Sequence, residues 1–182
     1  MTLRLLQRNA DTVRDEPTTS SSEETVARLF EEARDDVYRY LLLLGLPPAQ
    51  AQDATQEVFL RLYVVLRRGE RVDNPRAWIF RVAHNHGSTI RSRESSLVAL
   101  EPLETVLHDS QEDPETKMID QERLARLHQA VSGLSRQQQI CLYLRAEGFR
   151  YREIAKILDI SDSTVCEFLR RAIGRLRKEM HA

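Results

Sequence analysis

Apolar residues recur every three or four positions along most of the chain, which is the spacing of amphipathic helices. The first such stretch follows Ser21 and Glu24, a pair with the spacing of a capping box at a helix start. Gly45 and the prolines at 47 and 48 end it, because neither residue type continues a helix well. Its apolar stripe is Val26, Leu29, Phe30, Ala33, Val37, Leu41 and Leu44. The pattern therefore predicts a first helix that begins directly after Ser21.

Two more helices are predicted before a break in the pattern. One spans about residues 49–67 and has an apolar stripe on one side and polar residues on the other. A polar loop over residues 68–73 then leads to Asn74 and Pro75, an N-cap residue followed by proline at the first helical position. The third helix is expected to run from there to about residue 93. The apolar stripe of the second helix is Ala51, Ala54, Val58, Phe59, Leu62, Val65 and Leu66.

The helical period is lost between residues 94 and 118, where acids accumulate and Pro102 and Pro114 interrupt the chain. Such a composition is typical of a flexible tether, although an acidic interaction tail would have the same one. At the other end, residues 1–22 contain a run of Thr and Ser without a sustained period and are expected to be disordered. We therefore predict four segments: a disordered tail (1–22), a helical domain (23–93), an acidic linker (94–118) and a second helical domain (119–182).

The second domain is expected to begin with an amphipathic helix over residues 119–131 that Gly133 closes. Ser135 and Gln138 have the spacing of another capping box, which predicts a helix through Ala146. Two shorter helical stretches are expected to complete the chain.

Residues 151–168 have the pattern of a helix-turn-helix. Ala155 is small enough for two helices to cross closely, Asp159 tolerates the left-handed conformation of a tight turn, and Ser161 can cap the second helix. The apolar positions expected in the shared core are Ile154, Leu158, Ile160 and Val165. The second helix could then lie in the major groove of DNA, with Asp162, Ser163, Cys166 and Glu167 towards base edges and Arg170, Arg171, Arg175, Arg177 and Lys178 towards phosphates. An amphipathic hairpin with a basic end has the same pattern, because cations also favour helix C-termini.

Composition supports an all-α fold, since 30% of the 182 residues are charged and only 6 are glycine. The net charge of -1 does not by itself indicate binding to nucleic acid, but the acids of the linker and the bases of residues 168–178 are segregated along the chain.

Cys141 and Cys166 lack the spacing of a zinc site or disulfide framework. No phosphate loop, paired carboxylates or activated nucleophile can be assembled, so we expect neither an enzyme nor a cofactor. No apolar run is long enough for a membrane span or signal peptide, so we expect a soluble cytoplasmic protein.

Three motifs in order resemble bacterial sigma factors of the extracytoplasmic-function group, over nearly all of residues 23–178. Residues 53–60 (DATQEVFL) resemble the polymerase-binding helix of that family, residues 74–85 (NPRAWIFRVAHN) resemble its promoter-melting helix, and residues 151–171 resemble its C-terminal helix-turn-helix. The resemblance implies a subunit that binds RNA polymerase core and directs it to the -10 and -35 elements of promoters. Glu167 and Phe168 depart from the family, which commonly has a basic pair there, and this leaves the -35 specificity open.

The resemblance also implies binding residues and partners. The polymerase face, which would bind the clamp helices of the largest subunit, is Asp53, Gln56, Glu57 and Arg61. The -10 set is Arg68, Arg71, Asn74, Arg76, Arg81, His84, Asn85 and Arg91, with a flipped base held near the loop at residues 68–74. The -35 set is Ser161, Ser163, Thr164, Glu167, Arg170, Arg171 and Arg175. The implied partners are polymerase core, including its beta flap, promoter DNA and an anti-sigma factor, and we expect a monomer when free.

Two other functions remain open on the sequence. A helix-turn-helix regulator could act at operators without being a polymerase subunit, although the chain shows no heptad seam for dimerisation. A sigma-like decoy could instead sequester core or an anti-sigma factor without reading promoters, and Glu167 with Phe168 keeps that alternative open.

Overall fold

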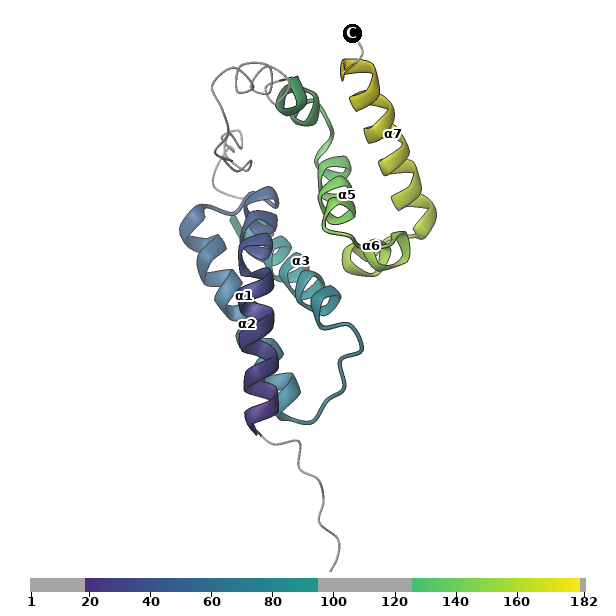
Figure 1. The fold of residues 1–182 in the computed structure, drawn as a ribbon. Coiled ribbons are helices and arrows are strands. Elements are labelled where there is room, and N and C mark those ends of the chain that lie inside the picture. Colours follow the sequence, from purple (N-terminus) through teal and green to yellow (C-terminus); the bar gives the residue numbers. More distant parts are fainter. Residues whose placement is uncertain (1–18, 95–125, 181–182) are drawn as a thin grey trace, which may run out of the picture.

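The computed structural model describes residues 19–94 and 126–180, and every regular element in these two stretches is a helix (Figure 1). The N-terminal half consists of α1 (Thr19–Leu43), α2 (Pro48–Arg67) and α3 (Pro75–Glu94). The C-terminal half consists of helical residues 126–132 followed by α5 (Arg136–Ala146), α6 (Tyr151–Leu158) and α7 (Asp162–Met180). The predicted all-α fold is confirmed. None of the described helices is long and apolar enough to cross a membrane.

Helix α1 begins earlier than the sequence pattern predicted. It already includes Thr19, so Ser21 lies inside the helix and the predicted cap there is wrong, as is the predicted disorder of residues 19–22. The first turns pack against the rest of the half: Ser22 is buried, and Tyr63 Oη on α2 donates to Glu23 Oε1 over 3.2 Å. These tertiary contacts outweigh the preference of serine for a cap position. The remainder of the predicted tail, residues 1–18, lies outside the described residues.

Helix α1 ends at Leu43, and Gly45 follows it in the turn, as predicted. Gly45 has a φ of +83°, the Gly45 N–H donates to Leu42 O over 2.7 Å, and the Leu46 N–H donates to Leu41 O over 3.2 Å. This pair of bonds is a Schellman motif, and Leu41 and Leu46 supply its buried apolar contact. A Cβ atom at Gly45 would meet the guanidinium of Arg136 from the C-terminal half, so that side chain would have to shift, while the positive φ disfavours any residue but glycine.

The predicted helix starts at Asn74, Ser135 and Ser161 agree with the structure, whereas the start predicted at residue 119 lies outside the described residues. Asn74 Oδ1 accepts the Ala77 N–H over 3.0 Å at the start of α3, and Ser135 and Gln138 form both bonds of a capping box at the start of α5. Asp159 has a φ of 54° at the left-handed turn, and Ser161 Oγ accepts the Thr164 N–H at the start of α7. Helix α7 is not the short stretch that was predicted but continues for 19 residues.

The two halves pack against each other through one continuous hydrophobic core. Phe80 of α3 meets Phe149, which follows α5, edge to face with 5.0 Å between ring centroids. Tyr40 of α1 lies 5.8 Å from Tyr143 of α5 by the same measure. In Figure 1, α5 and α6 lie beside α1 and α3, and α3 and α6 are in direct contact. The two predicted helical units are therefore joined by packing in the described residues, whereas nearly all of the predicted linker lies outside them.

Two helical glycines give a matched test of this packing. A Cβ on Gly87 in α3 would lie 2.9 Å from Leu44 Cδ1 and 3.0 Å from Leu41 Cδ2, and both leucines are buried. A Cβ on Gly174 in α7 would meet nothing within 4 Å. Both Gly→Ala changes gain about 1 kcal/mol of helix propensity, but only Gly87→Ala overpacks the core, at a cost of about 1–3 kcal/mol.

We therefore expect Gly174→Ala to raise the free energy of unfolding by about 1 kcal/mol, and Gly87→Ala to be less stable than Gly174→Ala by about 1–3 kcal/mol. Urea unfolding of both variants measures the difference. Equal stabilisation by the two substitutions would contradict the tight contact between α1 and α3.

Candidate partner and nucleic-acid interfaces

The exposed face of α2 carries the predicted polymerase-binding residues. Asp53 and Gln56 are exposed, Glu57 is half-buried, and Arg61 Nε donates to Glu57 Oε1 over 2.7 Å. The same face also carries Leu60, which is 59% exposed, and Val64, which is 43% exposed. Sequence reasoning missed these two, although the helical spacing from Glu57 and Arg61 places them on the polar side. The face therefore carries two acids in its N-terminal turns and two exposed apolar side chains in the turns that follow, and apolar and polar groups are combined in this way at protein interfaces.

The predicted -10 residues of α3 divide between two faces of the helix. Arg81 and Asn85, four residues apart, are exposed to solvent, and Arg91 is half-buried. Arg76 and His84 lie on another face, together with buried Phe80 and against the C-terminal half. In a helix with 3.6 residues per turn, side chains four positions apart lie on the same face. The cations that were predicted to form one strip therefore lie on two different faces of α3.

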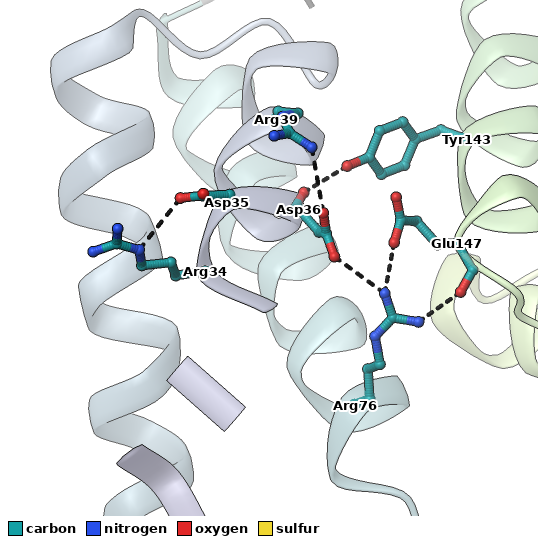
Figure 2. A network of polar contacts seen from close by, with 7 residues as sticks. All are labelled: Arg34, Asp35, Asp36, Arg39, Arg76, Tyr143 and Glu147. Carbon is teal, nitrogen blue, oxygen red and sulfur yellow. Dashed lines mark hydrogen bonds and ion pairs between the residues drawn. The ribbon is translucent and has the colours of Figure 1, made fainter. Parts of the chain in front are cut away.

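Arg76 is held by acidic residues from both halves (Figure 2). Its Nη2 atom lies 3.2 Å from Asp36 Oδ2 on α1 and 2.5 Å from Glu147 Oε2 at the end of α5. Its Nη1 atom donates to the Glu147 backbone oxygen over 2.5 Å. The guanidinium also lies over the rings of Phe80 and Phe149, at 5.7 and 5.3 Å from their centroids. Burial and the nearby Asp36 raise the pKa of Glu147, whereas its contact with Arg76 acts in the opposite direction.

The loop before α3 has a second contact of this kind. Asn74 Nδ2 donates to Glu153 Oε1 of α6 over 2.8 Å, while Asn74 Oδ1 caps its own helix. Arg68 is exposed, and Arg71 forms only an exposed ion pair of 3.6 Å with Asp73. The side chains of Arg68, Arg71, Arg81 and Asn85 are therefore accessible to a binding partner. Those of Asn74, Arg76 and His84 instead form contacts with other residues of the protein.

His84 lies in the shared core beside α1. Its Nδ1 atom and Tyr40 Oη share a hydrogen bond of 2.9 Å. Burial lowers the pKa of His84 from its ordinary value near 6.5, and burial raises the pKa of Tyr40 well above 10. Both side chains are therefore neutral in the folded protein near pH 7.

This burial predicts that the protein loses stability in mild acid. The unfolded chain protonates His84 near pH 6.5, whereas the folded chain does so only at lower pH, so stability falls as pH decreases from about 7.5 through 6.5. Urea unfolding between pH 5.5 and 7.5 should show that fall, and His84→Gln should flatten it. The pKa of His86 is also lowered, mainly by burial. The stability of His84→Gln should therefore still depend weakly on pH. An unchanged slope in His84→Gln would contradict this interpretation.

The helix-turn-helix exposes the start of α7. Ser161 Oγ is 2.8 Å from Ser163 Oγ and 2.7 Å from Thr164 Oγ1, in addition to its capping bond. Glu167 lies one turn further and binds Arg170 at 2.8 Å and Arg171 at 2.5 Å, and these hydrogen bonds lower its pKa. Arg175 is exposed on the next turn. Arg170 and Arg171 of the predicted -35 set therefore pair with Glu167, the acid that departs from the family pattern.

Sequence reasoning missed the residues that join the two halves. Asp36, Tyr143 and Glu147 lie on ordinary amphipathic helices or at their ends, and nothing in the local pattern distinguishes them. Tyr143 Oη donates to the Asp36 backbone oxygen over 2.8 Å, and Arg136 Nη2 donates to the Leu43 backbone oxygen over 2.9 Å. Within residues 19–94 and 126–180, no group of His, Cys, Asp and Glu side chains could hold a metal ion.

These features define a helical protein with a helix-turn-helix and an exposed face on α2 that combines acidic and apolar side chains. The family model for Sigma-70 region 2 matches residues 29–94, and the model for Sigma-70, region 4 matches residues 124–176. The chain is 31% identical over 159 residues to the ECF RNA polymerase sigma factor BldN of Streptomyces coelicolor, covering 83% of this chain and 58% of BldN. It is 25% identical over 165 residues to the ECF RNA polymerase sigma factor SigX of Bacillus subtilis, covering 87% of this chain and 84% of SigX.

Two solved structures share the fold. The sigma factor RpoE in complex with the anti-sigma factor NepR from Bartonella quintana gives a TM-score of 0.64 at 20% identity, covering 87% of this chain and 98% of the RpoE chain. CnrH in complex with the cytosolic domain of CnrY gives a TM-score of 0.54 at 19% identity, covering 88% of this chain and 90% of that chain. The two family models and the curated relatives show that this chain belongs to the sigma-70 family, in its extracytoplasmic-function group.

Proposed function

We propose that this chain binds RNA polymerase core and directs it to promoters by reading a -10 and a -35 element. Residues 23–93 would act as the core-binding and melting domain, and residues 119–182 would bind the -35 element. The observation that carries the proposal is the exposed face of α2, where Asp53 and Glu57 are followed by the exposed Leu60 and Val64 inside the segment that matches Sigma-70 region 2. The polymerase-bound protein would act in the cytoplasm as a non-catalytic subunit.

The chemistry of the α2 face supports docking on a basic helical partner. Leu60 and Val64 supply apolar area, and Asp53 and Glu57 supply negative charge on the same side. Apolar contacts give affinity at such a surface, while complementary charge fixes the orientation of the partner and speeds association. The clamp helices of the polymerase's largest subunit are the proposed partner.

The DNA contacts of the proposal differ in character between the two elements. At the -10 element, Arg81 and Asn85 on the exposed side of α3, with Arg68 and Arg71 in the loop before it, offer cations and an amide to a separated strand. A flipped base would be held near residues 68–74, at a cost of a few kcal/mol for unstacking. At the -35 element, the first turns of α7 would enter the major groove while Arg170, Arg171 and Arg175 neutralise phosphates.

An anti-sigma factor is a further proposed partner, because the structure of RpoE that shares this fold contains one. Such a partner would cover the same docking surfaces until a signal releases it. The alternative of a decoy is supported by Glu167, which occupies Arg170 and Arg171 that DNA would otherwise bind.

The test of the proposed function is transcription in vitro with purified core polymerase, this protein and a library of promoter fragments. We expect specific transcripts that depend on the protein, and their sequences would define both elements. Core binding without transcripts would favour the decoy. No binding to core, with binding to duplex DNA retained, would favour an operator-binding regulator.

A further inference from the structure

Helix α7 has an outer face that lies opposite its packed side. Val165, Leu169 and Ala172 are buried, on the side where α7 packs on α5 and α6. Figure 1 shows α7 at the edge of the C-terminal half, beside α5 and directly after α6. At 3.6 residues per turn, the positions opposite the buried stripe are Ser163, Glu167, Arg170 and Gly174. This outer line is the part of α7 that can approach the base edges in a DNA groove.

Glu167 is the acid on the outer line, and two arginines bind its carboxylate. Its Oε2 atom accepts from Arg170 Nη2 over 2.8 Å and from Arg170 Nε over 3.0 Å, and its Oε1 atom accepts from Arg171 Nε over 2.5 Å. These bonds lower the pKa of Glu167, so the carboxylate is ionised and can only accept hydrogen bonds. One acid and two bases leave the group with a net positive charge, so DNA phosphates attract it although it contains an acid.

The pairing leaves hydrogen-bond donors available on Arg171. Among the described residues, Arg171 donates through Nε alone, whereas Arg170 uses both Nε and Nη2. A guanidinium also carries N–H groups on both Nη atoms, so Arg171 can still form a two-pronged contact. Each oxygen of the Glu167 carboxylate can accept more than one bond. The outer face of α7 therefore presents an acceptor beside a pair of donors.

The order of these groups matches one kind of base pair. In the major groove, a cytosine–guanine pair presents the cytosine N4 donor beside two acceptors, guanine O6 and N7. A carboxylate next to a two-pronged guanidinium is complementary to all three groups. In an adenine–thymine pair, a single acceptor flanks the adenine N6 donor on each side, so the guanidinium cannot form two bonds beside the carboxylate. Ser163 does not discriminate in this way, because a hydroxyl both donates and accepts.

We propose that Glu167 selects a cytosine–guanine pair in the DNA that α7 binds, by accepting from cytosine N4 while Arg171 donates to guanine O6 and N7. The assignment of this pair to the -35 element rests on the proposed function, whereas the match to the base pair holds for any DNA that α7 binds. Arg170 would remain for a phosphate. The decoy alternative draws the opposite expectation from the same contacts, because arginines that are only neutralised by Glu167 would leave the chain without a base preference.

Two substitutions of Glu167 should change the base preference in different ways. Wild type should prefer cytosine at one position by about tenfold over the other bases. Glu167→Gln supplies an amide that both donates and accepts, the pattern that binds adenine N6 and N7, so the preference should move to adenine. Glu167→Ala should lose the preference at that position. It should also bind random duplexes more tightly and with a steeper salt dependence, because it releases both arginines for phosphates.

The measurement is selection from duplexes with a randomised -35 segment, carried out with the full chain alone and with the full chain bound to polymerase core. The base frequencies among the selected duplexes give the preference at each position. Glu179→Gln is the matched control, since it makes the same charge change at an exposed acid on another side of α7. Its base preferences should equal those of wild type. Arg171→Lys keeps the charge without the two-pronged donor and should weaken the cytosine–guanine preference.

A purely structural role for Glu167 predicts a different result. If its pairs with the arginines only stabilise α7, both substitutions of Glu167 would keep the wild-type base preference, and that result would overturn the proposal. Promoter-specific transcripts with an unchanged preference in Glu167→Gln would reject the base reading while leaving the proposed function in place. A switch from cytosine to adenine without transcripts from core would reject the proposed function while supporting the base reading. A wild-type chain that selects no base pair, alone or with core, would also overturn the proposal.

Discussion

Replacing two acids on α2, Asp53→Arg with Glu57→Arg, should weaken binding to polymerase core by about 100-fold or more and abolish specific transcripts. The two residues lie one turn apart on α2, where Asp53 is exposed and Glu57 is half-buried. Reversing both charges removes two attractions to a basic partner and adds two repulsions, and like charges at an interface cost several kcal/mol. A tenfold change in affinity corresponds to about 1.4 kcal/mol, so about 3 kcal/mol gives the expected loss.

The control for this prediction is a charge reversal of the same size on another helix. Glu31→Arg with Asp35→Arg changes two exposed acids with the same four-residue spacing on α1. We expect its affinity for core to stay within about threefold of wild type, since it alters only the general field of the protein. Affinities come from titration of core with fluorescently labelled protein at fixed salt. Equal losses in the two double variants would show that net charge, rather than the α2 face, controls binding.

The substitution Phe80→Ala should lower the free energy of unfolding by about 3–5 kcal/mol, which is a large part of the stability of a small protein. Phe80 is fully buried, and its ring contacts Tyr40 at 5.4 Å and Phe149 at 5.0 Å between centroids. Truncation therefore leaves a cavity that is bordered by both halves. It also removes one of the two rings beneath the Arg76 guanidinium.

Urea unfolding followed by circular dichroism measures this loss. Leu60→Ala is the matched control, because Leu60 is 59% exposed on α2 and its truncation should change stability by no more than about 0.5 kcal/mol. A loss below about 1.5 kcal/mol in Phe80→Ala would be incompatible with a core shared by the two halves.

Local signals in the sequence were sufficient for most helix starts and turns. Asn74 and Ser135 cap their helices with side-chain bonds to residues three positions away, and Asp159 adopts the left-handed turn. Each of these structures depends on neighbours within one helical turn, so the local pattern contains the information. Ser21 was the exception, because the packing of α1 against α2 extends the helix past a suitable cap.

The interfaces could be predicted only in part. The helical spacing of α2 placed Asp53, Gln56 and Glu57 on one polar side, and the same spacing places Leu60 and Val64 there, although their hydrophobic character concealed it. An apolar residue at such a position reads as core, since the pattern records hydrophobicity and not its surroundings.

By itself, the sequence determined the helical class, the helix-turn-helix and the family, because these depend on periodicity, caps and ordered motifs that are local along the chain. The tertiary structure alone decided which of the predicted DNA-binding residues are open. Arg76 meets Glu147 across 71 positions and Asn74 meets Glu153 across 79. The sequence pattern of a helix fixes which side is apolar, but the partner that covers that side is chosen by packing between distant segments, and here that packing closes the two halves around Arg76.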